Sequence, residues 1–109
     1  MWSRMLHRCI LGILMLSCSL GVGAQGYPNK TITLVVPFAP GGNIDVIARA
    51  IGPSLARETG QSVVVDNKPG AGGNIAHAYT ATAPADGSVI LFGSVGPLST
   101  APHLMKLPY

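Results

Sequence analysis

The chain has 109 residues, which is enough for one domain at most. It carries 7 basic and 4 acidic residues, and 48% of its residues are hydrophobic. Because disorder requires low hydrophobicity and high net charge, this composition predicts a folded chain with a buried core. The basic residues form no patch of the kind that nucleic-acid binding requires, so we expect no nucleic-acid partner.

The first 24 residues have the composition of an export signal. Two arginines precede an uninterrupted apolar run over residues 9–16, and Val22-Gly23-Ala24 supplies small residues before a cleavage point. We therefore expect residues 1–24 to be a cleaved signal peptide and residues 25–109 to form the exported domain. Two alternatives stay open, namely a retained membrane anchor and lipid attachment at Cys18.

The residues that commonly bind metals are scarce after this leader. Both cysteines, Cys9 and Cys18, lie within it, so the exported domain would hold no thiol for a disulfide or a metal site. His77 and His103 stand alone without metal-ligand spacing, and we interpret both as ordinary surface or half-buried side chains. No metal or other cofactor is expected.

After the leader, the first predicted elements are a strand and a helix. The β-branched and apolar run Thr31–Phe38 predicts the strand, and the glycines after it predict a turn. Apolar residues from Ile44 to Leu55 then recur at helical spacing. Gly52-Pro53 predicts a kink or a break in this helix, because proline removes a helical hydrogen bond. Gly60 predicts the end of the helix.

The same order of elements then recurs. Residues 62–65 predict a short strand that is buried on both faces, and a helix is predicted from Asn74 to about Thr82. Residues 89–93 predict a third strand. Residues 95–109 contain three prolines and no periodicity, so we expect them to be extended.

Strands that alternate with helices predict an α/β fold. Helices of this length between strands require crossover connections, which predict a parallel sheet of about three strands flanked by helices. Right-handed crossovers would bring the turns between strands and helices to one edge of the sheet. This is the edge at which open α/β sheets bind ligands.

The tetrapeptide Gly-Gly-Asn-Ile occurs twice at this edge, at residues 41–44 and 72–75. Backbone N–H groups at a helix N-terminus can bind an anion, and glycine lets the ligand approach closely. Ser94, which follows the third predicted strand, could add a hydroxyl donor. We expect both turns to face one pocket that holds a carboxylate. Glycine and asparagine are also ordinary turn residues, so a purely structural role stays open.

Sequence motifs of common enzymes are missing. No G-x-x-x-x-G-K motif follows the first strand, and Ile75 occupies the place of the last glycine in a dinucleotide fingerprint. Phe92 occupies the place of the first glycine in a G-x-S-x-G nucleophile motif. We therefore expect the protein not to be an enzyme.

Four segments match a known family in order: TITLVVPFAPGGNIDVIAR, VVVDNKPGAGGNIA, PADGSVILFGS and KLPY. Together they resemble the N-terminal part of the Bug receptors, which are extracytoplasmic solute-binding proteins of tripartite tricarboxylate transporters. The resemblance covers residues 27–109. It implies a partial periplasmic-binding-protein-like fold in which residues 25–109 form the N-terminal part of the first of two lobes.

The resemblance also implies a function and a set of contacts. It implies a periplasmic receptor that captures a small organic anion, such as a di- or tricarboxylate or a related solute, for membrane permease subunits. The implied ligand-binding residues are Phe38, Ala39, Pro40, Gly41, Gly42, Asn43, Asp45, Gly72, Gly73, Asn74, Ser94 and Gly96. For Asp45 a structural role stays open beside ligand contact, because a carboxylate in the first turn of a helix interacts favourably with the helix dipole.

Members of this family continue through a second lobe, whereas this sequence ends at Tyr109. A two-lobe receptor gains affinity by closing over its solute, so we expect the fragment alone to bind weakly and to be poorly stable. Two other functions stay open, namely a truncated relic that binds no solute and a small exported interaction module.

Overall fold

The computed structural model describes residues 26–109, and the predicted signal peptide lies outside the described residues. Three strands form one parallel sheet: β1 (Ile32–Val36), β2 (Val63–Asn67) and β3 (Val89–Leu91). Their order across the sheet is β2-β1-β3, so β1 lies in the middle. The predicted α/β fold with a parallel three-stranded sheet is therefore confirmed.

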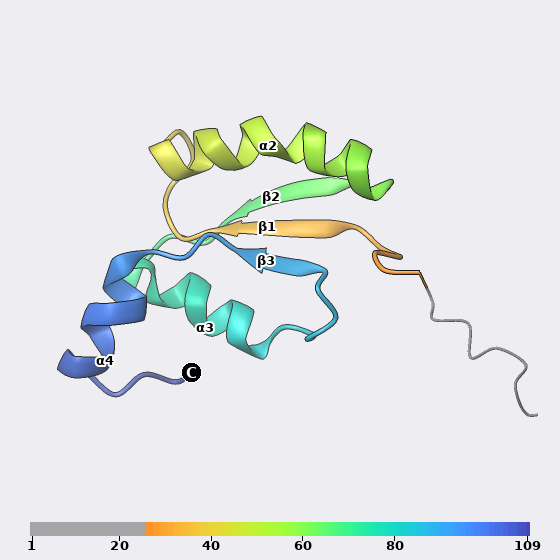
Figure 1. Ribbon diagram of the computed structural model, residues 1–109. Coiled ribbons are helices and arrows are strands. Elements are labelled where there is room, and N and C mark those ends of the chain that lie inside the picture. The colour runs from red at the N-terminus through yellow and green to blue at the C-terminus, as the bar shows by residue number, and fades with distance from the viewer. Residues whose placement is uncertain (1–25) are drawn as a thin grey trace, which may run out of the picture.

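Two helices cover the opposite faces of this sheet (Figure 1). Helix α2 (Asn43–Thr59) connects β1 to β2, and helix α3 (Asn74–Thr82) connects β2 to β3. The bounds of α3 are those predicted from the sequence. Successive side chains of a strand point to opposite faces, so alternate residues of β1 pack under α2 and the others under α3. The buried cluster between β1 and α2 consists of Ile32, Leu34 and Val36 from the strand and Ala48 from the helix.

Helix α2 ends where the sequence predicts but is not interrupted. Gly60 adopts a left-handed conformation with φ of 68°, and its N–H donates to the carbonyl of Ala56. The helix continues through Pro53, so a break at this position is wrong. Gly52 is buried against Val63 of β2, and this packing holds the helix on the sheet while the proline ring is exposed.

The expectation that the second strand is buried on both faces is wrong. Val64 of β2 is 51% exposed. Among the described residues, β2 lies at the edge of the sheet, and α3 packs on β3 and β1 instead. One face of β2 is therefore left uncovered.

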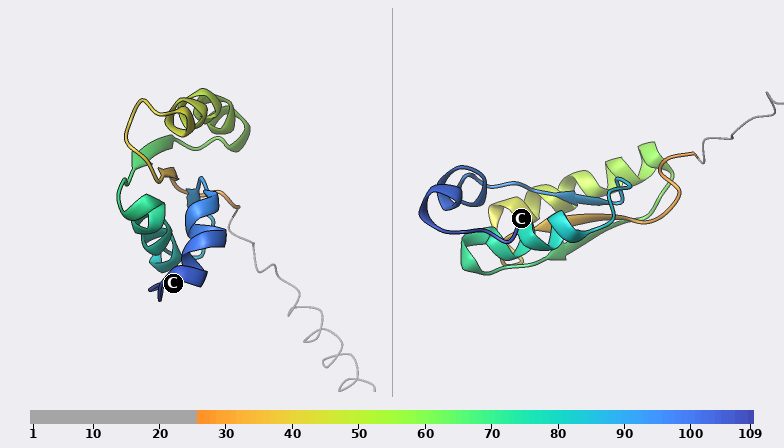
Figure 2. Two further views of the ribbon diagram at one scale, coloured as in Figure 1. Left: turned by 90° about the vertical axis from the view of Figure 1, so that its left-hand side faces the viewer. Right: turned by 90° about the horizontal axis from the view of Figure 1, so that it is seen from below.

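The prediction that residues 95–109 are extended is wrong for residues 96–104, which are helical, while residues 105–109 form neither helix nor strand. A wide π-helical turn spans Gly96–Thr100, and a short helix α4 follows at Ala101–Leu104. Pro97 and Pro102 occupy the first turn of these elements, where the missing N–H of proline costs no hydrogen bond. Figure 2 shows these turns beside the start of α3 at one end of the sheet.

Candidate ligand-binding site

The three turns that follow the strands lie at the same edge of the sheet, because the strands are parallel (Figure 1). Gly73 is the point where they meet. A methyl group on Gly73 would lie 3.4 Å from Pro37 Cβ in the first turn and 3.3 Å from Ser94 Oγ in the third. The structure therefore brings together the three segments that the sequence assigns to one site.

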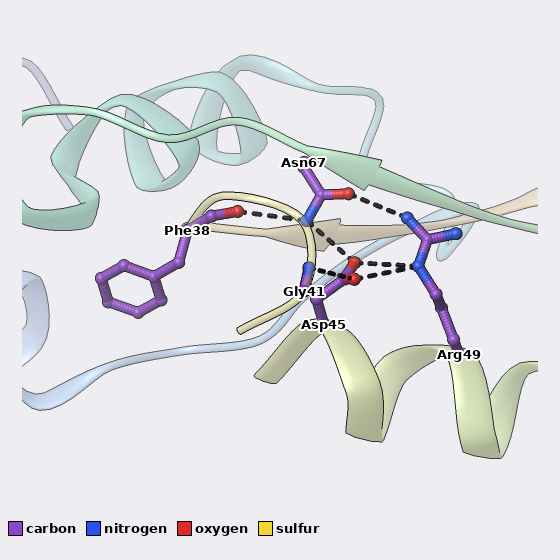
Figure 3. Close-up of polar contacts among 5 residues, drawn as sticks. All are labelled: Phe38, Gly41, Asp45, Arg49 and Asn67. Carbon is purple, nitrogen blue, oxygen red and sulfur yellow. Dashed lines mark hydrogen bonds and ion pairs between the residues drawn. The ribbon is translucent and has the colours of Figure 1, made fainter. Parts of the chain in front are cut away.

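The first turn is held by a cluster of five residues (Figure 3). Asp45, which is only 3% exposed, accepts hydrogen bonds from the Gly41 amide at 2.9 Å and from Asn67 Nδ2 at 2.9 Å. Arg49 Nε donates to both carboxylate oxygens of Asp45, at 3.1 and 3.0 Å. Arg49 Nη2 also donates to Asn67 Oδ1 at 3.1 Å, and Asn67 Nδ2 donates to the Phe38 carbonyl at 3.1 Å.

The Asp45 carboxylate is turned into the protein, towards Gly41, Arg49 and Asn67. Its pKa falls from the ordinary 3.8 to about 2, first because Arg49 donates to the charged form and then because Gly41 and Asn67 do so. In this structure Asp45 therefore holds the turn and the start of α2. Sequence reasoning did not single out Arg49 or Asn67, which complete the cluster.

We expect the protein to lose stability in acid because the Asp45 carboxylate becomes protonated. Because its pKa is lower in the folded protein, the carboxylate stabilises the fold above pH 3.8 and loses this effect as the pH falls towards 2. Urea unfolding between pH 5 and about pH 2 should show a steeper decline for the wild type than for Asp45→Asn. If the free energy of unfolding falls equally with pH in the wild type and in Asp45→Asn, the stabilising role of the Asp45 carboxylate is contradicted.

The second turn satisfies its own amides. The Gly73 N–H donates to the Gly70 carbonyl at 2.9 Å, and the Asn74 N–H donates to Ala71 through a short 3₁₀ turn at Ala71–Gly73. The expectation that the turn amides are unpaired is therefore wrong for Gly73 and Asn74. It is also wrong for Gly41, whose partner is the carboxylate four residues later.

Within the two Gly-Gly-Asn segments, two amides remain unpaired, and the hydroxyl of Ser94 is unpaired as well. Asn43 and Gly72 are exposed, and within residues 26–109 their N–H groups have no hydrogen-bond acceptor. Ser94 Oγ is buried and also has no partner in this part of the chain. Gly96 lies close to the carbonyl of Gly72 and keeps the third turn against the second. The Asn43 and Gly72 amides are the donors that a ligand could reach in this structure, whereas the Ser94 hydroxyl is buried beside them.

The side chain of Asn74 is occupied within the protein. Its Nδ2 donates to the Ala71 carbonyl at 2.9 Å, and its Oδ1 accepts from the Tyr109 hydroxyl at 2.7 Å. The other predicted residues of the first turn, Ala39 and Pro40, are exposed.

The side chain of His77 contacts the second turn, and sequence reasoning did not identify this contact. It is only 4% exposed, so the expected surface or half-buried position is wrong. Its Nδ1 lies 2.9 Å from the Gly73 carbonyl, which can only accept, so Nδ1 carries the proton. The sequence did hold one indication of this contact, because His77 follows Gly73 by about one helical turn, which places both on the same side of the helix.

The described chain forms an open surface at these turns. A cavity of about 440 Å³ lies beside the third turn and is lined by Leu98, Met105 and Tyr109 among others, but by none of the predicted ligand-binding residues. Within residues 26–109, no His, Cys, Asp or Glu cluster could hold a metal ion. None of the helices there has the length and apolar character needed to cross a membrane.

A family model described as "Tripartite tricarboxylate transporter family receptor" matches residues 47–109. The protein BugT of Bordetella pertussis is 40% identical over 104 residues, which cover 92% of this chain and 32% of BugT. The chain spans about a third of the length of curated relatives that it matches.

Solved structures show the same similarity. The structure of MatC from Rhodopseudomonas palustris with bound malate is 40% identical, with a TM-score of 0.70 over 76% of this chain and 29% of that one. An R. palustris protein solved with adipate is 46% identical, with a TM-score of 0.62 over 65% of this chain and 24% of that one. Other similar structures are of periplasmic proteins, including the binding protein BugD.

Proposed function

Because the chain belongs to the receptor family of the tripartite tricarboxylate transporters, we propose that it forms part of the ligand-binding wall of a solute receptor. The resemblance to Bug receptors is confirmed by this membership and by similarity to BugT and BugD. Receptors of this family are periplasmic, bind solutes and are not enzymes. We propose a small organic anion, such as a di- or tricarboxylate, as the solute.

The meeting of the three turns at Gly73 carries this proposal. It places two exposed amides, of Asn43 and Gly72, and the unpaired hydroxyl of Ser94 at one edge of the sheet. All three are neutral donors, and a carboxylate accepts hydrogen bonds from such groups strongly. Similar proteins hold malate and adipate, both of which are dicarboxylates.

The organisation of the whole protein is part of the same proposal. We propose that residues 1–24 direct export and that residues 25–109 begin the first lobe. A second lobe would supply the opposite wall, since the relatives are about three times as long as this chain. The loaded receptor would deliver its solute to membrane permease subunits.

Calorimetry on the protein expressed from its complete gene tests this function, with malate and adipate as the first ligands. We expect binding of one molecule, and ligand at 100 times its Kd should raise the free energy of unfolding by about 2.7 kcal/mol. Ser94→Ala should weaken binding. A protein that melts cooperatively but binds no di- or tricarboxylate would contradict the proposal and favour an interaction module.

A further inference from the structure

Asn67 connects the first ligand turn to the second. It is the last residue of β2, so the second turn begins directly after it. Its side chain reaches across to the first turn, where it contacts the Phe38 carbonyl and the Asp45 carboxylate (Figure 3). A single side chain thus ties together two segments that are 29 residues apart.

Only an amide of this length satisfies the groups around Asn67. Its Nδ2 supplies two N–H donors, one to Phe38 and one to Asp45, while its Oδ1 accepts from Arg49. An aspartate at position 67 would have no N–H to donate to the Phe38 carbonyl or to the Asp45 carboxylate, and it would place a second negative charge beside Asp45. Alanine would leave the Phe38 carbonyl and Arg49 Nη2 without these partners.

The first turn has few other contacts that set its shape. Phe38 is 38% exposed, and the three residues after it are exposed as well. Within the turn, the Gly42 amide donates to the Ala39 carbonyl at 3.4 Å, which is a long hydrogen bond. The cluster of Asp45, Arg49 and Asn67 is therefore the main restraint on the turn.

We propose that Asn67 is a positioning residue that sets the first ligand turn against the second, so that the Asn43 and Gly72 amides face the same solute. It contacts the turn through Phe38 and Asp45 and does not contact the solute itself. This inference rests on the proposed function of the two turns.

The experiment compares three forms of the protein expressed from its complete gene with the wild type. Asn67→Ala removes the link, and the double variant Asp45→Asn with Asn67→Asp keeps one carboxylate, one amide and the guanidinium in the cluster. In the double variant residue 67 cannot donate to the Phe38 carbonyl. Asn29→Ala is the matched control, because Asn29 is exposed and has no hydrogen bond in residues 26–109.

Two measurements separate a positioning role from a purely structural one. NMR amide shifts and exchange rates of Ala39, Gly41 and Gly42 report the conformation of the first turn without any ligand. Calorimetry with malate and adipate reports the affinity. Asn67→Ala should increase exchange at Gly41 about tenfold and weaken binding about tenfold. The double variant should regain stability but not the amide shifts or the affinity, and Asn29→Ala should change neither.

Each outcome bears on a different claim. If the amides of Ala39, Gly41 and Gly42 keep their shifts and exchange rates in folded Asn67→Ala, the inference is overturned, whether or not any ligand binds. It is also overturned if the double variant regains full affinity. If the wild type binds no dicarboxylate, the proposed function fails, and the amide measurements still decide whether Asn67 positions the turn.

Discussion

Gly73→Ala is expected to lower the free energy of unfolding by about 2 to 4 kcal/mol, from backbone strain and overpacking together. Gly73 has φ of 100° and is buried where the three turns meet. The added methyl group would lie 3.1 Å from Pro97 Cγ and 3.3 Å from Ser94 Oγ. Both contacts are tight, so the third turn must move away from the second.

Solute binding should weaken in the same variant, by about tenfold or more, because the Ser94 hydroxyl and the Gly72 amide would separate. Gly72→Ala is the matched control, since Gly72 also has a positive φ, of 64°, but a methyl group there meets nothing within 4 Å. Gly72→Ala should lower the free energy of unfolding by only about 1 kcal/mol. Urea unfolding of both variants tests this contrast in stability, and equal losses would show that Gly73 is not the meeting point. Calorimetry on Gly73→Ala tests the loss of affinity.

Elements set by local signals could be predicted from the sequence. The end of α2 at Gly60 and the bounds of α3 follow from a glycine that adopts a left-handed conformation and from an alanine-rich helical run after a glycine pair. The common edge of the three turns followed from parallel connections, which have a fixed hand. These features need no knowledge of which side chains touch.

Features that depend on contacts between distant segments could not be predicted in this way. The Gly-Gly-Asn-Ile repeat indicated two helix starts with free amides, yet Gly41 is paired with a carboxylate four residues away. Asn67 joins this cluster from another strand, and no pattern in its own segment indicates it. Likewise, Pro97 suggested an extended chain, but it is buried in a helical turn against Gly73.

The pairing of the turn amides changes how the two turns can discriminate between solutes. The Asp45 carboxylate occupies the Gly41 amide, while Arg49 neutralises its charge within the same cluster. The site therefore offers a few oriented neutral donors rather than a broad positive field. Selectivity among organic anions should depend on where carboxylate oxygens lie relative to Asn43, Gly72 and Ser94, and less on total charge.

Leu34→Ala is expected to lower the free energy of unfolding by about 2 to 5 kcal/mol. Leu34 lies in the central strand β1, is 1% exposed and packs against α2 in the main buried cluster. Small domains bury a small core and have total stabilities of only about 5 to 15 kcal/mol. The loss of this side chain should therefore remove a large part of the stability.

Leu104→Ala is the matched control, because Leu104 in α4 is 74% exposed. This substitution should lower the free energy of unfolding by less than about 0.5 kcal/mol. Urea unfolding of both variants gives the comparison, and an equal loss would show that Leu104 is covered in the protein. Leu34 lies away from the turns that follow the strands, so the folded fraction of Leu34→Ala should keep the affinity of the wild type. Gly73→Ala, in contrast, should lose affinity even when fully folded, which separates the residues that build the sheet from those that shape its ligand edge.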